Sequence, residues 1–171
     1  MTHVDGCIDQ ALITCAHKTV GALRQAGRTV VTAESCTAGL ISAALSQVDG
    51  AGEILHGSFV TYSKASKAMA LGVDAALLER DGSVNAEVVR QLVFGALARS
   101  SADIALAVSG VLGPSSDEDG NPVGLVYFGC GHRGGAIAVT CRNYGDQPHD
   151  MLRRHVVMEG LDLLSRSAAA P

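Results

Sequence analysis

The spacing of apolar residues along the first half of the chain switches between two periods, which predicts helices alternating with strands. Spacing near i, i+4 and i+7 over residues 8–26 predicts a helix that ends at Gly27. The β-branched run from Thr29 to Thr32 is typical of a buried strand. A second helical pattern begins at Leu40 and continues to about Val48, and residues 49–52 are then expected to form a turn.

The middle of the chain predicts a second strand and three helical segments. Residues 54–62 have strand character, and Ser63 is a good N-cap for a short helix that stops at Gly72. Residues 74–79 predict another helical turn, closed by Asp81 and Gly82. Asn85 then caps a helix whose apolar side comprises Val88, Leu92, Val93, Ala96 and Leu97.

The last part predicts one more buried strand, a hairpin and a closing helix. Residues 103–108 are a continuous apolar run, which marks a strand covered on both faces. A glycine turn follows over residues 109–114, and residues 115–121 are polar, acidic and expected to be mobile. Two hairpin strands and a final helix are expected over residues 123–130, 136–144 and 149–165.

Helices and strands that alternate first and end in a hairpin predict an α/β fold. The arrangement expected is a three-layer sandwich, in which a mixed β-sheet has helices on both faces. At 171 residues, without an internal repeat or a linker, the chain is expected to be a single domain with an ordered core over about residues 8–165.

Composition excludes several functional classes. The net charge of −4 and the lack of a basic run argue against a nucleic-acid surface, and the scarcity of aromatic residues argues against base stacking. No apolar stretch is long enough to span a membrane, and residues 1–20 do not have the pattern of an export signal. The five scattered cysteines are therefore expected to be reduced thiols of a cytoplasmic protein, and neither they nor the six histidines have metal-ligand spacing.

The segment from Thr29 to Gly39 contains the first candidate chemistry. A strand that turns sharply into a helix lifts one side chain out of the turn, and it leaves the first N–H groups of the helix unpaired. Ser35 at this corner is a candidate nucleophile, beside N–H groups suited to an oxyanion or a phosphate. The alternative is that Ser35 or Thr37 only caps the helix.

Three segments together resemble the CinA carboxy-terminal domain family in order and spacing. They are TAESCTAG, then GSFVTYSKASKAMALGV, then AVSGVLGP followed by PVGLVYFG, and the resemblance covers about residues 8–165. Characterised members are amidohydrolases that convert nicotinamide mononucleotide to nicotinate mononucleotide and ammonia in pyridine nucleotide salvage. The resemblance implies a serine/lysine mechanism without a metal or other cofactor, and it places Ser35, Lys67, Tyr62 and Ser109 in the catalytic site.

The chemistry of these residues is plausible on its own terms. A serine hydroxyl needs a base to attack an amide, and none of the three segments contains a histidine. A neutral Lys67 can serve if burial, or a second cation such as Lys64, lowers its pKa. The alternative for Lys67 is a solvated helix lysine. Tyr62 could donate to the leaving ammonia or hold Lys67, and its alternative is an edge-strand aromatic packed on a helix. Ser109 could relay a hydrogen bond to Ser35 or to the amide, and its alternative is a turn residue.

Substrate binding is expected at backbone amides. The N–H groups of Cys36 and Thr37 are the expected oxyanion hole, next to Ala38 and Gly39. The turn from Gly110 to Gly113 offers further N–H groups and lets a ligand approach the backbone closely.

The chain departs from the family pattern on the phosphate side. Gln147 stands where members usually carry an arginine implicated in activity, so Arg142, Arg153 or Arg154 would have to replace its charge. Ala38 replaces a glycine, and the acidic residues 115–119 should repel a phosphate. Two functions are therefore open: an active amidohydrolase, or a weakly active or inactive relative that binds a nucleotide or a protein.

The resemblance and the low surface charge also predict a homo-oligomer, most simply a dimer. A dimer interface is a second possible source of a cation for the phosphate. The family includes longer proteins with an additional amino-terminal domain, and this chain resembles the stand-alone form.

Overall fold

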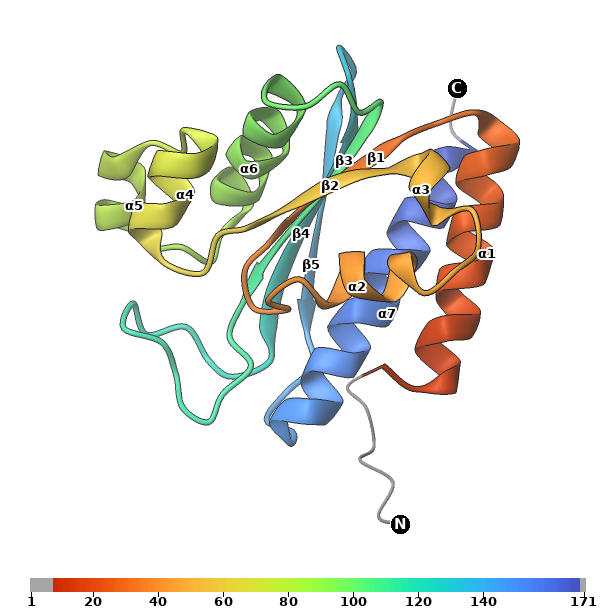
Figure 1. The fold of residues 1–171 in the computed structure, drawn as a ribbon. Helices are drawn as coiled ribbons and strands as arrows, with labels where there is room; N and C mark the ends of the chain where they lie inside the picture. The colour runs from red at the N-terminus through yellow and green to blue at the C-terminus, as the bar shows by residue number, and fades with distance from the viewer. Residues whose placement is uncertain (1–7, 170–171) are drawn as a thin grey trace.

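A computed structural model describes residues 8–169, whose strands form one mixed five-stranded sheet in the order β2-β1-β3-β4-β5 (Figure 1). Strand β1 pairs in parallel with both β2 and β3, whereas β3–β4 and β4–β5 are antiparallel. The strands are β1 (Val30–Glu34), β2 (Leu55–Val60), β3 (Ile104–Gly110), β4 (Leu125–His132) and β5 (Ile137–Asn143). The helices are α1 (Gln10–Ala26), α2 (Leu40–Ser46), α3 (Ala51–Ile54), α4 (Lys64–Leu71), α5 (Ala75–Asp81), α6 (Ala86–Ala98) and α7 (His149–Ala168).

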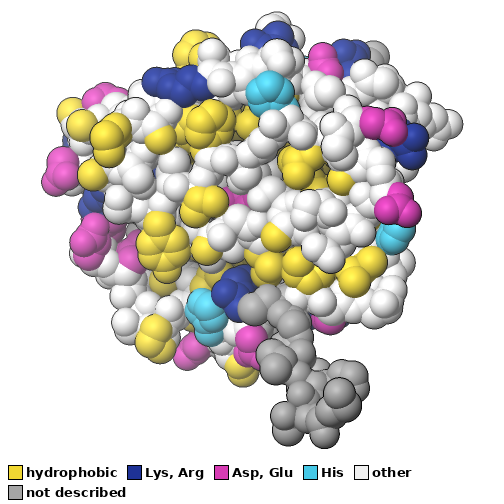
Figure 2. Space-filling view, in the orientation of Figure 1, with side chains coloured by type: hydrophobic (Ala, Val, Ile, Leu, Met, Phe, Trp, Pro, Cys, Tyr) yellow, Lys and Arg dark blue, Asp and Glu magenta, His cyan; other side chains and the backbone are white. Residues whose placement is uncertain are grey.

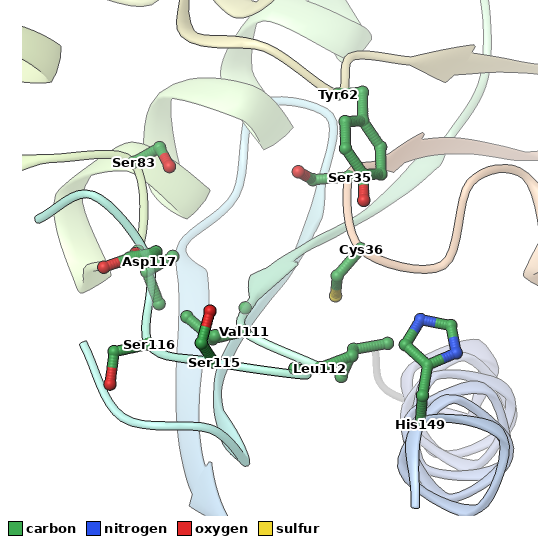
Figure 3. A pocket seen from close by; sticks show the side chains of 13 residues that line it. Ser35, Cys36, Tyr62, Ser83, Val111, Leu112, Ser115, Ser116, Asp117 and His149 are labelled. Carbon is green, nitrogen blue, oxygen red and sulfur yellow. The ribbon is translucent and has the colours of Figure 1, made fainter. Parts of the chain in front are cut away.

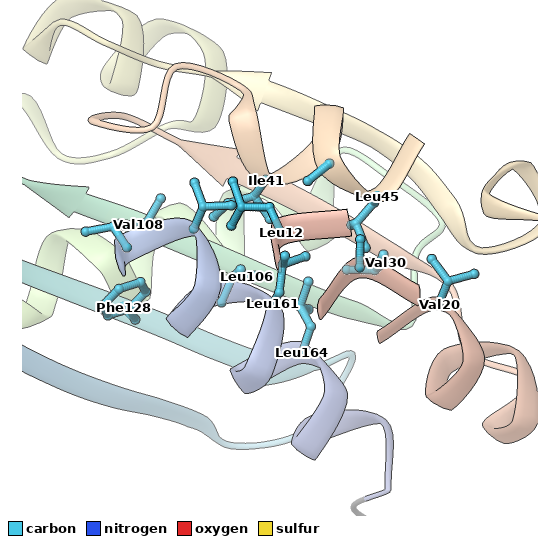
Figure 4. Close-up of a cluster of buried hydrophobic side chains, with 14 of the residues drawn as sticks. Leu12, Val20, Val30, Ile41, Leu45, Leu106, Val108, Phe128, Leu161 and Leu164 are labelled. Atoms are coloured by element: carbon cyan, nitrogen blue, oxygen red, sulfur yellow. The ribbon is translucent and has the colours of Figure 1, made fainter. Parts of the chain in front are cut away.

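Helices cover both faces of the sheet. On one face α1, α2 and α7 pack over a core cluster that includes Leu12, Ile41, Leu106, Phe128 and Leu161 (Figure 4). On the other face α4, α5 and α6 pack over a second cluster, which is built mainly of valine, leucine and alanine (Figure 1). The predicted α/β sandwich with a mixed sheet is therefore confirmed.

Burial along the strands follows their place in the sheet. All five residues of β1 and the first six of β3 are buried, because these central strands are covered on both faces. The edge strand β2 instead alternates between half-buried and exposed residues. The apolar runs in the sequence thus correspond to the strands that carry the site.

Most boundaries differ from the sequence prediction by one or two residues, and three of the differences have a clear structural cause. Residues 51–54 form the short helix α3 instead of a turn, since Gly50 adopts φ 84° and begins a helix there. Strand β3 continues through Ser109 to Gly110, because both residues pair with β4. Helix α7 extends past residue 165 to Ala168, which is buried in the core.

The three parallel strands place their carboxyl ends at the same edge of the sheet. The chain leaves β1 toward β2 on one side and returns through α4, α5 and α6 to β3 on the other side of β1. Such a reversal of strand order opens a crevice at the carboxyl ends of the strands. Ser35, Thr61 and Val111 directly follow the three strands at this edge.

Charged side chains are sparse and dispersed on the face shown in Figure 2, where Lys, Arg, Asp and Glu stand among uncharged atoms. Within residues 8–169 no helix is long and apolar enough to cross a membrane. Cys15, Cys36, Cys130 and Cys141 are free thiols, and Cys7 lies outside the described residues.

Candidate active site

Ser35 lies in a turn directly after β1 and is 7% exposed. Its N–H donates to the carbonyl of Val108 at 3.1 Å, which continues the β1–β3 pairing by one residue and fixes the backbone of the turn. Helix α2 begins only at Leu40, so Ser35 stands before the helix on a separate turn over residues 35–39.

The carboxylate of Glu34 occupies the start of α2. It accepts the N–H groups of Ile41 and Ser42 at 3.0 and 2.9 Å and the hydroxyl of Thr37 at 2.7 Å. Glu34 is fully buried, and these donors compensate for the loss of water around its charge. The prediction that the first N–H groups of this helix bind a ligand is therefore wrong. The alternative that Ser35 or Thr37 caps the helix is also wrong, because Glu34 serves that purpose.

The turn after Ser35 contains a strained residue. Ala38 adopts φ 52° and is the one non-glycine residue with positive φ within the described part of the chain. This conformation costs about 1 kcal/mol for an alanine. Gly39 follows at φ 91°, a value that glycine tolerates freely. The turn is thus set in a shape that leaves Ser35 facing α4.

Lys67 extends from α4 to Ser35. The predicted caps Ser63 and Gly72 bound this helix, and they fix the direction of its first turns. The Nζ atom of Lys67 lies 2.9 Å from Oγ of Ser35 and 2.8 Å from the carbonyl oxygen of Thr61. The carbonyl oxygen of Tyr62 lies 3.4 Å away. Lys67 is completely buried, so the predicted contact between hydroxyl and amine is confirmed and the solvated-lysine alternative is wrong.

Burial lowers the pKa of Lys67 from 10.5 to about 8, while the nearby Cys36 opposes this shift. Lys64 has no part in it, because it forms ion pairs with Asp119 and Glu118 at 2.7 and 3.1 Å. The expectation that Lys64 depresses the pKa of Lys67 is thus wrong, and desolvation is the cause. A neutral amine fits the three neighbours of Nζ: two N–H groups donate to the carbonyls, and the lone pair accepts the Ser35 proton.

Cys36 is the other nucleophilic atom beside this pair. Burial raises the pKa of its thiol to about 12, so the thiolate is not populated near neutral pH and Ser35 is the better nucleophile. The backbone N–H groups of Cys36 and Thr37 lie beside the Cys36 thiol and act on its pKa against the effect of burial. Their use as an oxyanion hole stays a prediction.

A cavity of about 300 Å³ opens above Ser35 (Figure 3). Ser35, Cys36 and Tyr62 form one wall, and the loop after β3 forms the opposite wall. Gly110 and Gly113 also line it, as predicted for substrate-binding residues, whereas Thr37, Ala38 and Gly39 do not. The cavity therefore lies at the crevice between β1 and β3.

Two predicted catalytic residues lie differently from expectation. Ser109 is buried, and its hydroxyl donates to the carbonyl of Ser83 at 2.7 Å, so it is not a relay to Ser35. The hydroxyl instead joins β3 to the segment before α6. The side chain of Tyr62 is 71% exposed and lines the cavity, while its carbonyl contacts Lys67. It is not an edge-strand aromatic packed on a helix.

A model of the CinA C-terminal domain matches residues 12–168. The chain belongs to the CinA C-terminal domain family. The resemblance carried by three sequence segments is thereby confirmed. A CinA-like protein from Mycolicibacterium vanbaalenii is 39% identical over 142 residues, which are 83% of this chain and 33% of that protein. The nicotinamide-nucleotide amidohydrolase PncC of Pseudomonas putida is 40% identical over 140 residues, or 82% of this chain and 86% of that one.

Solved structures of the CinA superfamily share the fold. The competence/damage inducible protein CihA from Agrobacterium tumefaciens has a TM-score of 0.87 and 32% identity, covering 99% of this chain and all of that chain. A superfamily protein from Klebsiella pneumoniae has a TM-score of 0.88 and 30% identity, covering 94% and 99%. This chain spans about a third of the length of the CinA-like relatives that it matches.

Within residues 8–169 no lysine or arginine lines the cavity at Ser35 or the hollow next to it. Gln147 donates to the carbonyl of Tyr144 at 2.6 Å and lines an adjoining hollow instead of the cavity at Ser35. Two of the three suggested replacements form ion pairs elsewhere, Arg142 with Glu159 and Arg154 with Asp9. Arg153 lines neither the cavity nor the hollow. None of these three arginines therefore replaces the charge at position 147.

Several residues of the cavity were not expected from the sequence. These are Ser83, Val84 and His149, whereas Leu112 and residues 115–117, which also contribute to its wall, lie in segments that the sequence already connected with the substrate. His149 opens helix α7 directly after Pro148, a position that the sequence marks as a helix start but not as part of a site. The buried Glu34 directly precedes Ser35 in the AES motif, but the sequence did not indicate which groups its carboxylate would accept. Residues 8–169 contain no cluster of ligands suited to a metal ion.

Proposed function

We propose that this CinA domain is a serine amidohydrolase that cleaves the carboxamide of a nicotinamide nucleotide. Two relatives named nicotinamide-nucleotide amidohydrolase PncC support this substrate class, and nicotinamide mononucleotide is the first substrate to test. The observation that carries the proposal is the 2.9 Å contact between Ser35 and a fully buried Lys67. A protein that only binds a ligand has less need of an amine buried at this cost.

In the proposed reaction Ser35 is the nucleophile and Lys67 the general base. Neutral Lys67 takes the hydroxyl proton while Oγ attacks the carboxamide carbon, and the oxyanion forms next to the N–H groups of Cys36 and Thr37. The Lys67 ammonium then returns the proton to the amide nitrogen, and ammonia leaves. Water attacks the resulting ester and gives a proton to Lys67. The carboxylic acid is released, and the proton returns to Ser35.

The test is ammonia release from nicotinamide mononucleotide by the purified chain. Ser35→Ala and Lys67→Met are expected to lower turnover by at least about a thousandfold, because each removes a group that the covalent step needs. Ser46→Ala and Lys18→Met alter an exposed serine on α2 and an exposed lysine on α1, and they should leave turnover unchanged. Turnover that survives Lys67→Met in a folded protein would remove the lysine from the mechanism.

A further inference from the structure

The wall of the cavity above Ser35 carries negative and not positive formal charge. Asp117 and His149 are its titratable side chains apart from Tyr62 and Cys36, and the adjoining hollow adds Asp146. Within residues 8–169 no lysine or arginine lines either space. The nearest amine, Nζ of Lys67, is fully buried behind Ser35 and contacts Ser35 and two carbonyl groups.

Neighbouring acidic residues add to this charge. Glu118 and Asp119 follow Asp117 in the same loop, and the single cation that pairs with both of them is Lys64. The cluster of these three side chains therefore keeps a net negative charge. Helix α7 begins at His149 with its positive dipole end toward the hollow, but this partial charge is smaller than one carboxylate.

We infer that this site prefers nicotinamide compounds that lack a phosphate, with the riboside as a better substrate than the mononucleotide. The inference rests on the proposed amidohydrolase function. The pyridinium ring carries one positive charge. The carboxylates of Asp146 and Asp117 attract it, and that of Asp117 also accepts N–H groups of Asp119 and Asn121 in its own loop. The phosphate of the mononucleotide adds about two negative charges at neutral pH, and the same carboxylates repel them.

The size of the preference follows from Coulomb's law. In water the repulsion between two like unit charges decreases in inverse proportion to the distance between them. A dianion near two carboxylates makes four such pairs, which at separations of about 12 Å together disfavour binding by a factor of about ten. The preference is therefore expected to decrease as salt screens the charges.

The experiment compares kcat/KM for nicotinamide riboside and nicotinamide mononucleotide at low and high ionic strength. The expected result is a ratio of about ten in favour of the riboside at low salt, and a smaller ratio at high salt. Inorganic phosphate is the second probe, and it is expected not to compete with either substrate. A higher kcat/KM for the mononucleotide, together with competitive inhibition by phosphate, would overturn the inference and leave the proposed function intact.

A pair of variants tests whether the cavity wall sets the preference. Ser116→Lys places a cation on the wall, whereas Gln25→Lys makes the same change in net charge at an exposed position on α1. Ser116→Lys should raise kcat/KM for the mononucleotide about tenfold relative to the riboside, and Gln25→Lys should leave the ratio unchanged. An equal ratio in both variants would overturn the inference. Failure to hydrolyse either compound would instead overturn the proposed function, and the inference with it.

Discussion

The amine of Lys67 is buried away from solvent, so the activity of the protein should depend on pH. Burial lowers its pKa to about 8, so the neutral base is the minor form at neutral pH. We expect kcat/KM to rise about tenfold per pH unit below about pH 8 and to level off above it. A pH–rate profile without an inflection near this value would contradict the assignment of Lys67 as the base.

The same residue should make stability depend on pH. The pKa of Lys67 is 10.5 in the unfolded chain and about 8 in the folded one. Between these values the unfolded state binds one more proton, so the free energy of unfolding increases with pH across this window, by about 3 kcal/mol in total. Below about pH 8 both states are protonated and the gain is absent. Denaturant unfolding at both ends of the window should show this rise in the natural chain and lose it in Lys67→Met.

At the scale of single residues, the sequence predicted the contact but not all of its causes. Ser35 lies in a family motif before β2, and Lys67 lies in a second family motif that continues past β2. The family pattern therefore suggested that the two side chains are in contact. The bond from Ser109 to Ser83 joins positions 26 residues apart, and nothing in the local sequence around either serine indicates it. The ion pairs of Lys64 likewise depend on how the loop after β3 folds back.

At the scale of elements, helix α4 depends on a close approach to α6. A Cβ atom at Gly95 would lie 2.0 Å from the carbonyl oxygen of Leu71, the last residue of α4. Gly95→Ala must therefore displace α4, which carries Lys67. We expect a loss of about 2 to 3 kcal/mol in the free energy of unfolding and a large loss of kcat. Gly21→Ala on α1 is the matched control.

A Cβ atom at Gly21 meets nothing within 4 Å, so alanine there should stabilise the protein by about 0.5 to 1 kcal/mol. Urea unfolding and ammonia release measured on both variants check the pair. If Gly95→Ala were as stable and as active as Gly21→Ala, the contact between α4 and α6 would not position Lys67.

The elements most reliably predicted are those whose ends are marked by caps. Helix α4 was predicted at both ends because Ser63 and Gly72 are strong start and stop signals. Helix α3 was missed, since its four residues follow an Asp-Gly pair and contain a glycine, which is a typical turn composition. The role of Glu34 at the start of α2 was also missed, because its partners are decided by how the turn at residues 35–39 folds.

At the scale of the whole molecule, the site is assembled from segments on different sides of the sheet. The turn at Ser35 leads into α2 on one face, whereas Lys67 comes from α4 on the other face. The loop after β3 closes the cavity from a third direction (Figure 3). The sequence predicted the layers from the alternation of elements, but the shape of the cavity depends on this loop, which was expected to be mobile.

Lys64 joins that loop to α4 and should decide how firmly the cavity wall is held. Its Nζ contacts Asp119 and Glu118, and the other oxygen of Asp119 accepts the N–H of Ser83 at 3.3 Å. These carboxylates raise the pKa of Lys64, so the amine stays charged across the neutral range. Lys64→Met should release the loop, raising KM several-fold while kcat changes little, because Ser35 and Lys67 are untouched.

Hydrogen exchange at residues 115–121 gives an independent readout of the released loop, since amides in a loosened segment exchange faster. Lys18→Met, which removes an exposed ion pair with Asp162 on the opposite face of the sheet, is the control and should change neither KM nor exchange in the loop. High salt applied to the natural chain should reproduce part of the Lys64→Met effect on exchange, because partly exposed ion pairs are screened. Unchanged exchange in Lys64→Met would mean that the loop is fixed by the hydrogen bonds that Asn121 donates to the Asp117 carboxylate.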